Sequence, residues 1–412
     1  MLYSMLWKAW YKPERLKMNF PSSWEISLLN MKDSLPIPRS EILNKINNPY
    51  ESKILKDIAK GKKNAVIAVD DLTRPTKASQ ILPIVIKELL AGGIKHENIL
   101  ILIALGAHPA MHRIDLIRKL GKYIVNNFTV YNHSPFHNLV SFGKTSYNTP
   151  VYINKFFAES DVKIGIGSIL PHPTAGFGGG GKIVLPGVAG VESILKNHTP
   201  TISGESGGLF EVENNDNRLD IEEAARMAKL DFTINQVCSG NGEIAGIFAG
   251  DFVSAHREGV KFALKIYATM DPKKIFDILV VNAFPMDTNL IQIGKGLNVI
   301  RPGFEDLIHP NGSIVFIGAC PEGRGYHYLC DYQLPLWHTL DKNTHINRVV
   351  EKRDLFVLSP NLRQKDVDDF FPIGTRLCKN WNKVNNYLEN KHLKKAKVGI
   401  FPYGSLQILE SR

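Results

Sequence analysis

The chain has 412 residues, enough for two or three domains, and its 44% apolar and 22% charged residues are typical of a folded globular protein. The net charge of +10 comes from scattered lysine-rich stretches without interleaved aromatic residues, which disfavours nucleic-acid binding and favours small anionic ligands. The four cysteines form no C-x-x-C pair, and no apolar run reaches roughly 18 residues. Lys8 interrupts the apolar start of the chain and no small-residue cleavage site follows, so we do not expect a signal peptide there. We therefore expect a reduced, cytoplasmic protein that inserts into no membrane.

The first part of the chain leads into an alternation of strands and helices. Residues 1–63 predict a β-ribbon or irregular lead-in with short helices at about 40–47 and 51–60. The continuous apolar run at residues 65–69 predicts a strand that is buried on both faces, as in a parallel sheet. The alternation continues with these predicted elements: a helix at 78–91, a strand at 99–105, a helix at 111–120, and strands at 129–133, 151–153 and 162–167.

A second alternation follows a long loop. Residues 200–217 predict that loop, followed by a helix at 218–230, a strand at 232–238 and a helix at 254–269. Further strands are predicted at 276–282, 313–318, 355–358 and 397–401. The fold class is therefore α/β, with mostly parallel sheets in two domains and the site in the cleft between them. We predict an N-terminal domain over residues 1–272 and a smaller C-terminal domain over residues 273–412.

Chemically distinctive sequences follow three strands of the first alternation. They are D-D-L-T-R-P-T at residues 70–76, G-A-H at 106–108, and P-H-P-T-A-G-F-G-G-G-G-K at 171–182. In parallel sheets, ligands bind outside the carboxyl ends of the strands. We therefore expect these three segments to meet in one crevice.

The glycine run Gly178–Gly181 exposes backbone N–H groups to which an anionic group can come close. Its spacing to Lys182 matches a P-loop, but Ile183 stands where that motif needs Ser or Thr, and Pro186 follows where a helix should continue. A nucleoside triphosphatase is therefore disfavoured. Lys182 is instead a candidate phosphate counter-charge or an amine for covalent chemistry.

Further candidate residues surround this segment. His108 and His172 are a possible acid/base pair, Arg74 a possible carboxylate clamp, and His198 a possible metal ligand. The other histidines, His327 among them, lie in no comparable setting, so we expect them to be structural or at the surface.

These motifs, with N-H-T at residues 197–199 and D-x-N-L-x-Q-x-x-K-G at 287–296, resemble the nickel-dependent lactate racemases and their 2-hydroxy-acid racemase and epimerase relatives. The resemblance runs from about Tyr11 to the end of the chain. It implies a nickel-pincer nucleotide (pyridinium-3-thioamide-5-thiocarboxylic acid mononucleotide) that is covalently attached to Lys182, with His198 as the nickel ligand. The implied cofactor-binding residues are Asp71, Leu72, Thr73, Arg74, Gly178, Gly179, Gly180, Gly181 and Lys182.

The resemblance also implies the reaction, which is inversion of C2 of a 2-hydroxy acid. Reversible hydride transfer to the cofactor avoids a carbanion beside the carboxylate, and His108 and His172 each serve as acid or base for one stereoisomer. Arg74 would bind the substrate carboxylate. Gln292 and Lys295 match the family's other substrate contacts.

One position departs from the family pattern: Ile291 stands where lactate racemase has tyrosine, which puts lactate itself in doubt as the substrate. The expected partners are a small 2-hydroxy acid and cofactor-maturation proteins, with no nucleic acid and no membrane. Two alternatives stay open. One is a non-catalytic protein of the same fold that binds a nucleotide or hydroxy acid, and the other is an enzyme that uses a nucleotide cofactor non-covalently.

Overall fold

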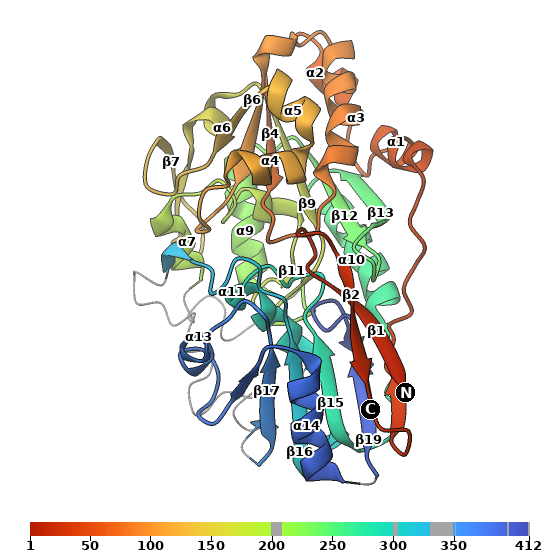
Figure 1. The fold of residues 1–412 in the computed structure, drawn as a ribbon. Coiled ribbons are helices and arrows are strands. Elements are labelled where there is room, and N and C mark those ends of the chain that lie inside the picture. Colours follow the sequence, from red (N-terminus) through yellow and green to blue (C-terminus); the bar gives the residue numbers. More distant parts are fainter. Residues whose placement is uncertain (199–207, 300–303, 330–348, 351, 394, 411–412) are drawn as a thin grey trace.

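The fold is built around two six-stranded sheets, which occupy the upper and lower halves of the molecule in Figure 1. The structure is a computed structural model that describes residues 1–198, 208–299, 304–329, 349–350, 352–393 and 395–410. Most neighbouring strands in both sheets are parallel, so the predicted α/β fold class is confirmed. Residues 200–207 of the predicted loop and Thr199 of the N-H-T motif lie outside the described residues.

The first sheet has the strand order β13-β12-β9-β4-β5-β6. All its pairings are parallel except that of β12 with β13, which is antiparallel. Its strands are β4 (Ala65–Asp70), β5 (Ile99–Ala104), β6 (Thr129–Asn132), β9 (Val162–Ser168), β12 (Phe232–Cys238) and β13 (Ile244–Gly250).

The continuous apolar run of β4 exists because both faces of this strand are covered. Ala65, Ile67 and Val69 point into one core, together with the helix α3 (Ala78–Ala91). The alternate residues Val66 and Ala68 point into a second core, which contains parts of α7 (Val191–Asn197) and α9 (Asp216–Met227). A strand that is buried on both sides needs apolar residues at every position.

The second sheet has the strand order β18-β17-β16-β15-β19-β3 and is parallel throughout. Its strands are β3 (Glu25–Leu28), β15 (Phe276–Asn282), β16 (Ile308–Ile317), β17 (Asp354–Leu358), β18 (Arg376–Cys378) and β19 (Lys397–Phe401). Helix α14 (Trp381–His392) and the N-terminal hairpin of β1 (Leu2–Trp7) and β2 (Glu14–Asn19) share a core on one face of this sheet.

Sheet membership crosses the predicted domain division, which stays a prediction. β3 pairs with β19, and the β1–β2 hairpin packs in the core of the second sheet. The predicted strand at 151–153 is β8 (Pro150–Asn154), which pairs with β7 (Leu139–Lys144) in a separate two-stranded ribbon. The predicted helix at 51–60 is shorter, α2 (Leu55–Ala59).

The remaining elements connect the sheets or cover them. They are α1 (Arg39–Asn47), α4 (Arg113–Leu120), α5 (Lys122–Asn127), α6 (Lys155–Glu159), β10 (Pro171–His172), β11 (Gly176–Phe177), α10 (Ser254–Tyr267), β14 (Ala268–Thr269), α11 (Leu290–Ile293), α13 (Gln364–Asp368) and β20 (Ile408–Leu409). Within the described ranges, none of the helices has both the length and the apolar character that a membrane span needs.

Candidate active site

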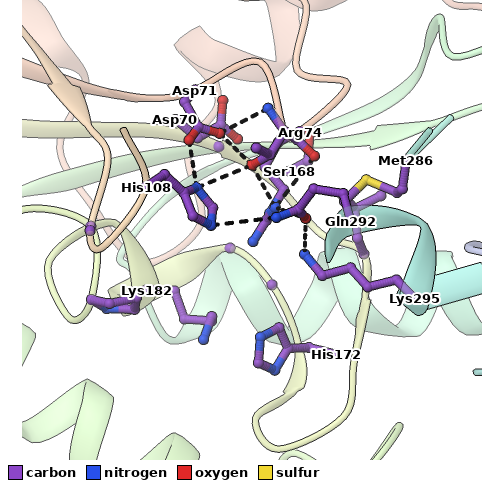
Figure 2. Close-up of a pocket in the computed structure, with 18 of the residues that line it drawn as sticks. Asp70, Asp71, Arg74, His108, Ser168, His172, Lys182, Met286, Gln292 and Lys295 are labelled. Atoms are coloured by element: carbon purple, nitrogen blue, oxygen red, sulfur yellow. Dashed lines mark hydrogen bonds and ion pairs between the residues drawn. The ribbon is translucent and has the colours of Figure 1, made fainter. Parts of the chain in front are cut away.

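A cavity of about 730 Å³ lies at the carboxyl ends of β4, β5 and β9, and residues that follow β15 close its other side. The three segments expected to meet in one crevice all contribute to its lining. Figure 2 shows side chains from the segments after β4 and β5, such as Arg74 and His108, and from the segment after β15, such as Lys295, pointing into this space. The carboxyl-end rule for parallel sheets therefore places the candidate residues together.

Most of the predicted site residues line the cavity. They are Asp71, Thr73, Arg74, His108, His172, Gly178, Gly179, Gly180, Lys182, His198, Gln292 and Lys295. Two do not line it. Leu72 is buried in the core beneath β4, and Gly181 packs against α9, where an added Cβ would lie 3.1 Å from the Ala225 side chain.

Asp71 fixes the orientation of His108. The Nδ1–H group of His108 donates to Oδ2 of Asp71 at 2.6 Å, and the backbone N–H of Thr73 donates to Oδ1 at 2.9 Å. Burial opposes ionisation of Asp71, but His108, Arg74 and the Thr73 hydroxyl outweigh it and hold the carboxyl pKa well below its usual range. The proton on Nδ1 leaves the lone pair of His108 on Nε2, which lies 3.5 Å from the Gln292 amide nitrogen.

Gln292 connects two basic side chains, Arg74, which follows β4, and Lys295, which follows β15. Its Oε1 atom accepts hydrogen bonds from Arg74 at 3.1 Å and from Lys295 at 2.7 Å. Burial and the neighbouring Arg74 hold the pKa of Lys295 well below its usual value. The Arg74 guanidinium shares one neutral acceptor with Lys295, so its positive charge is available for an anion, and a carboxylate fits the donors of both side chains.

The glycine segment is held by two buried side chains that sequence analysis missed. Arg218 of α9 donates to the backbone carbonyls of Ala175, Phe177 and Gly179. His256 of α10 forms a 2.8 Å hydrogen bond to the Gly178 carbonyl. Both contacts join residues far apart in the chain, and no sequence motif signals them.

Lys182 lies in a short 3-10 turn (Gly180–Ile183) and not in a helix, unlike a P-loop lysine. Its Nζ atom is buried and has no hydrogen-bond partner among the described residues. Burial, with Arg218 and Arg74 nearby, holds the pKa of this amine well below its usual value. A buried neutral amine without a partner is suited to a covalent bond with a ligand.

His172 lines the cavity from the β10–β11 turn. Its Nδ1 atom accepts from the backbone N–H groups of Ala175 at 3.2 Å and Thr174 at 3.4 Å. Burial, Lys182 and Lys295 lower the His172 pKa well below its usual value. Both the hydrogen bonds and the surroundings therefore favour the neutral ring.

His198 presents a free nitrogen lone pair in the cavity. Its Nδ1–H group donates to the Ile194 carbonyl at 2.9 Å, which leaves Nε2 unprotonated, and burial and Lys182 lower its pKa to about 4. A neutral imidazole fixed in this way is a suitable metal ligand. In the described parts of the chain no three His, Cys, Asp or Glu residues cluster as a metal site. A metal at His198 would therefore need ligands from a bound group.

The cavity also contains residues that the sequence did not indicate. His327, expected to be structural or at the surface, lines it with its ring centre 5.1 Å from that of His108. Its pKa is lowered to about 2 by burial and by His108. Ile291 also lines the cavity, whose lining includes the apolar side chains of Met286, Leu297 and Phe370.

Comparison with known proteins gives four findings. The family described as "Lactate racemase N-terminal domain" matches residues 11–208. The chain is 32% identical over 323 residues to a lactate racemase from Thermoanaerobacterium thermosaccharolyticum, covering 76% of this chain and 74% of that protein. It is 33% identical over 298 residues to a lactate racemase from Lactiplantibacillus plantarum, covering 70% and 69%. The structure of the lactate racemase apoprotein from T. thermosaccharolyticum is similar over the whole of both chains, with a TM-score of 0.78 and 25% identity.

Proposed function

The chain belongs to the lactate racemase family, and from this premise we propose that it inverts C2 of a 2-hydroxy acid, either lactate or a related acid. The enzyme is accordingly an isomerase of the racemase type. The proposal assigns each part of the reaction to side chains that line the cavity between the two sheets.

Arg74 and Lys295 bind the substrate carboxylate in this proposal. The support is their position on either side of Gln292, whose single amide oxygen accepts from both side chains. A carboxylate has two oxygens and a negative charge, so it satisfies these donors better than the amide does. Because Arg74 follows a strand of the first sheet and Lys295 follows a strand of the second, substrate binding also joins the two halves of the site.

His108 and His172 move the hydroxyl proton in this proposal. His108 has its Nδ1 proton on Asp71 and its Nε2 lone pair available, so it can accept a proton in the cavity. The Asp71 carboxylate then stabilises the protonated ring. His172 serves the opposite stereoisomer, for which its Nδ1 must leave the backbone N–H donors of residues 174 and 175.

The residues present fit the nickel-pincer nucleotide. We assign the covalent attachment to Lys182, nickel ligation to Nε2 of His198, and further contacts to Thr73 and the glycine segment. When bound, this group supplies a reversible acceptor for the hydrogen on C2, which a protein side chain cannot provide. Its loading requires maturation proteins, which we propose as partners.

The observation that carries the proposal is the buried Lys182 amine, which has no hydrogen-bond partner in the described part of the chain and lines the same cavity as an imidazole suited to a metal. The test is to produce the protein in a host that makes active lactate racemase. We expect an intact-mass increase that maps to Lys182, bound nickel, and racemisation of a 2-hydroxy acid by chiral chromatography. The matched control is Lys182→Arg, which keeps a long basic side chain but cannot form the same link.

Three outcomes would contradict the proposal. Unmodified Lys182 in a competent host would favour a non-covalent cofactor, whereas a loaded protein that turns over none of a panel of 2-hydroxy acids would favour the non-catalytic binding protein. Undiminished racemisation by Lys182→Arg would show that the attachment is assigned to the wrong residue.

A further inference from the structure

Helix α4 directs a charged residue inwards. Lys119 is fully buried, whereas Ile114 of the same helix is 57% exposed. An isolated buried ammonium group is costly unless all its protons are hydrogen-bonded. The reason for burying a lysine here must therefore lie in what its Nζ atom contacts.

Three oxygens surround the Lys119 amine. It donates to the backbone carbonyls of Asp71 at 2.7 Å and Arg74 at 3.0 Å, and it forms a 2.7 Å ion pair with Oδ1 of Asp70. The two carbonyls use two of the three donors of the ammonium group, and the Asp70 carboxylate balances its charge. The two carbonyls belong to the residues that orient His108 and contact Gln292, so Lys119 fixes both ends of that turn.

Trp10 covers this arrangement from outside. It lies at the tip of the β1–β2 hairpin, between Trp7 and Glu14, and packs against the core of the first sheet. The Nζ atoms of Lys77 and Lys119 lie 5.2 and 5.3 Å from the centre of its ring, within the range of cation–π attraction. The Trp10 Nε1–H group has no partner among the described residues, so the ring contributes by its face and its apolar bulk.

The hairpin tip is also anchored to the other half of the molecule. The backbone N–H groups of Lys8 and Ala9 donate to the buried Asp287 carboxylate at 2.6 and 3.0 Å, and the Tyr11 hydroxyl donates to Glu322 at 2.5 Å. Figure 1 shows the hairpin, in red, running along the second sheet towards the first. The tip therefore fixes Trp10 relative to both sheets that form the cavity.

We propose that Lys119 and Trp10 are positioning residues for the site. Lys119 fixes the backbone of the turn from Asp71 to Arg74, and Trp10 of the N-terminal hairpin holds Lys119 in position and shields it from water. Neither residue lines the cavity, so neither touches the substrate. This inference rests on the proposed racemase function, because it concerns how Asp71 and Arg74 are held for that reaction. The N-terminal hairpin, which packs with the second sheet, would therefore help to position site residues that follow a strand of the first sheet.

The first test compares Lys119→Met with Lys163→Met. Lys163 is also a buried lysine, 7% exposed, but it donates to the Ser160 carbonyl away from the cavity. Misplacing catalytic groups by about 1 Å can cost on the order of 100-fold in rate. We expect Lys119→Met to lower kcat/KM by about that factor, with KM raised because Arg74 is displaced, and Lys163→Met to lower the Tm without this kinetic change.

A second pair covers the case that Lys119→Met fails to fold. Trp10→Phe keeps an aromatic face and removes only the unpartnered N–H group, so we expect activity within a few-fold of wild type. Trp10→Ala removes the ring, and we expect it to lose at least about ten-fold in kcat/KM. Equal activities for the Phe and Ala variants would overturn the proposal.

A readout on the cofactor-free protein separates this proposal from the proposed function. Phenylglyoxal modification of Arg74, followed by peptide mass spectrometry, reports how firmly the turn is held. We expect faster modification in Lys119→Met and Trp10→Ala, and a wild-type rate in Lys163→Met and Trp10→Phe. If the loaded wild-type protein racemises nothing, the proposed function fails while this labelling still decides the positioning role. Unchanged labelling in both test variants would refute that role.

Discussion

Replacing Asp71 with asparagine tests the proposed acid/base chemistry most directly. Asp71 is 5% exposed and accepts the Nδ1 proton of His108 at 2.6 Å. An asparagine of the same shape can still accept from the Thr73 backbone N–H through its amide oxygen, so the turn is expected to persist. The negative charge that stabilises protonated His108 is lost. If the amide nitrogen faces His108, the ring proton also moves to Nε2, where the lone pair is needed.

The size of the effect follows from the charge separation. A carboxylate and a protonated imidazole in direct contact have charge centres about 4 Å apart, and at an effective dielectric constant of about 20 their attraction is about 4 kcal/mol. Each 1.36 kcal/mol on a barrier corresponds to about ten-fold in rate. We therefore expect Asp71→Asn to slow the step that uses His108 by roughly 1,000-fold.

The assay is a single-turnover experiment with each pure enantiomer, in which formation of the 2-oxo acid is followed. If His108 is the base for one enantiomer and His172 for the other, Asp71→Asn slows one enantiomer by the calculated factor and leaves the other within a few-fold. His172→Ala should give the reverse pattern, and thermal unfolding controls for misfolding. Equal losses for both enantiomers, or none for either, would refute the two-base reasoning.

Three further predictions concern the metal, the substrate pocket and pH. His198→Ala should lose nickel, measured by mass spectrometry of the metal, whereas His172→Ala should keep nickel and lose racemisation. The opposite result would make His172 the nickel ligand and His198 the acid/base residue. Ile291→Tyr should raise turnover of lactate relative to acids with larger apolar side chains, by about 1–3 kcal/mol or roughly 10–200-fold. A panel of 2-hydroxy acids assayed by chiral chromatography measures this preference, and an unchanged preference would contradict the prediction. Buried His133 has its pKa lowered to about 4 by burial, so below about pH 6.5 the unfolded chain takes up a proton that the folded chain does not. Stability is therefore lost as pH falls, and urea unfolding at pH 7 and 5 should show wild type losing about 2 kcal/mol more than His133→Gln; equal losses would disprove the assignment.

The sequence by itself determined the alternation of strands and helices. Strands that are buried on both faces need apolar residues at every position, so the β4 run at residues 65–70 is visible without any knowledge of its neighbours. The carboxyl-end rule then brought Arg74, His108 and Lys182 together before any distance was known. Both inferences depend on local patterns, which the chain carries in consecutive residues.

The tertiary structure alone decided which distant segments meet. β3 pairs with β19 across most of the chain, and the hairpin tip places Trp10 over Lys119. Both depend on how segments far apart in the chain pack together, and no local sequence pattern records that. α4 illustrates the limit: it buries Lys119 and exposes Ile114, the reverse of what the two residue types favour by themselves.

The same distinction holds within the site. The sequence identified His108 and Asp71 as residues of interest, but their hydrogen bond, which fixes where the His108 proton lies, depends on the relative position of two strand ends. His327 and Arg218 had no motif, because their importance comes only from what lies beside them. Residue type and spacing determine which chemistry is available. Packing between segments far apart in the chain determines the protonation state and orientation in which each group is presented.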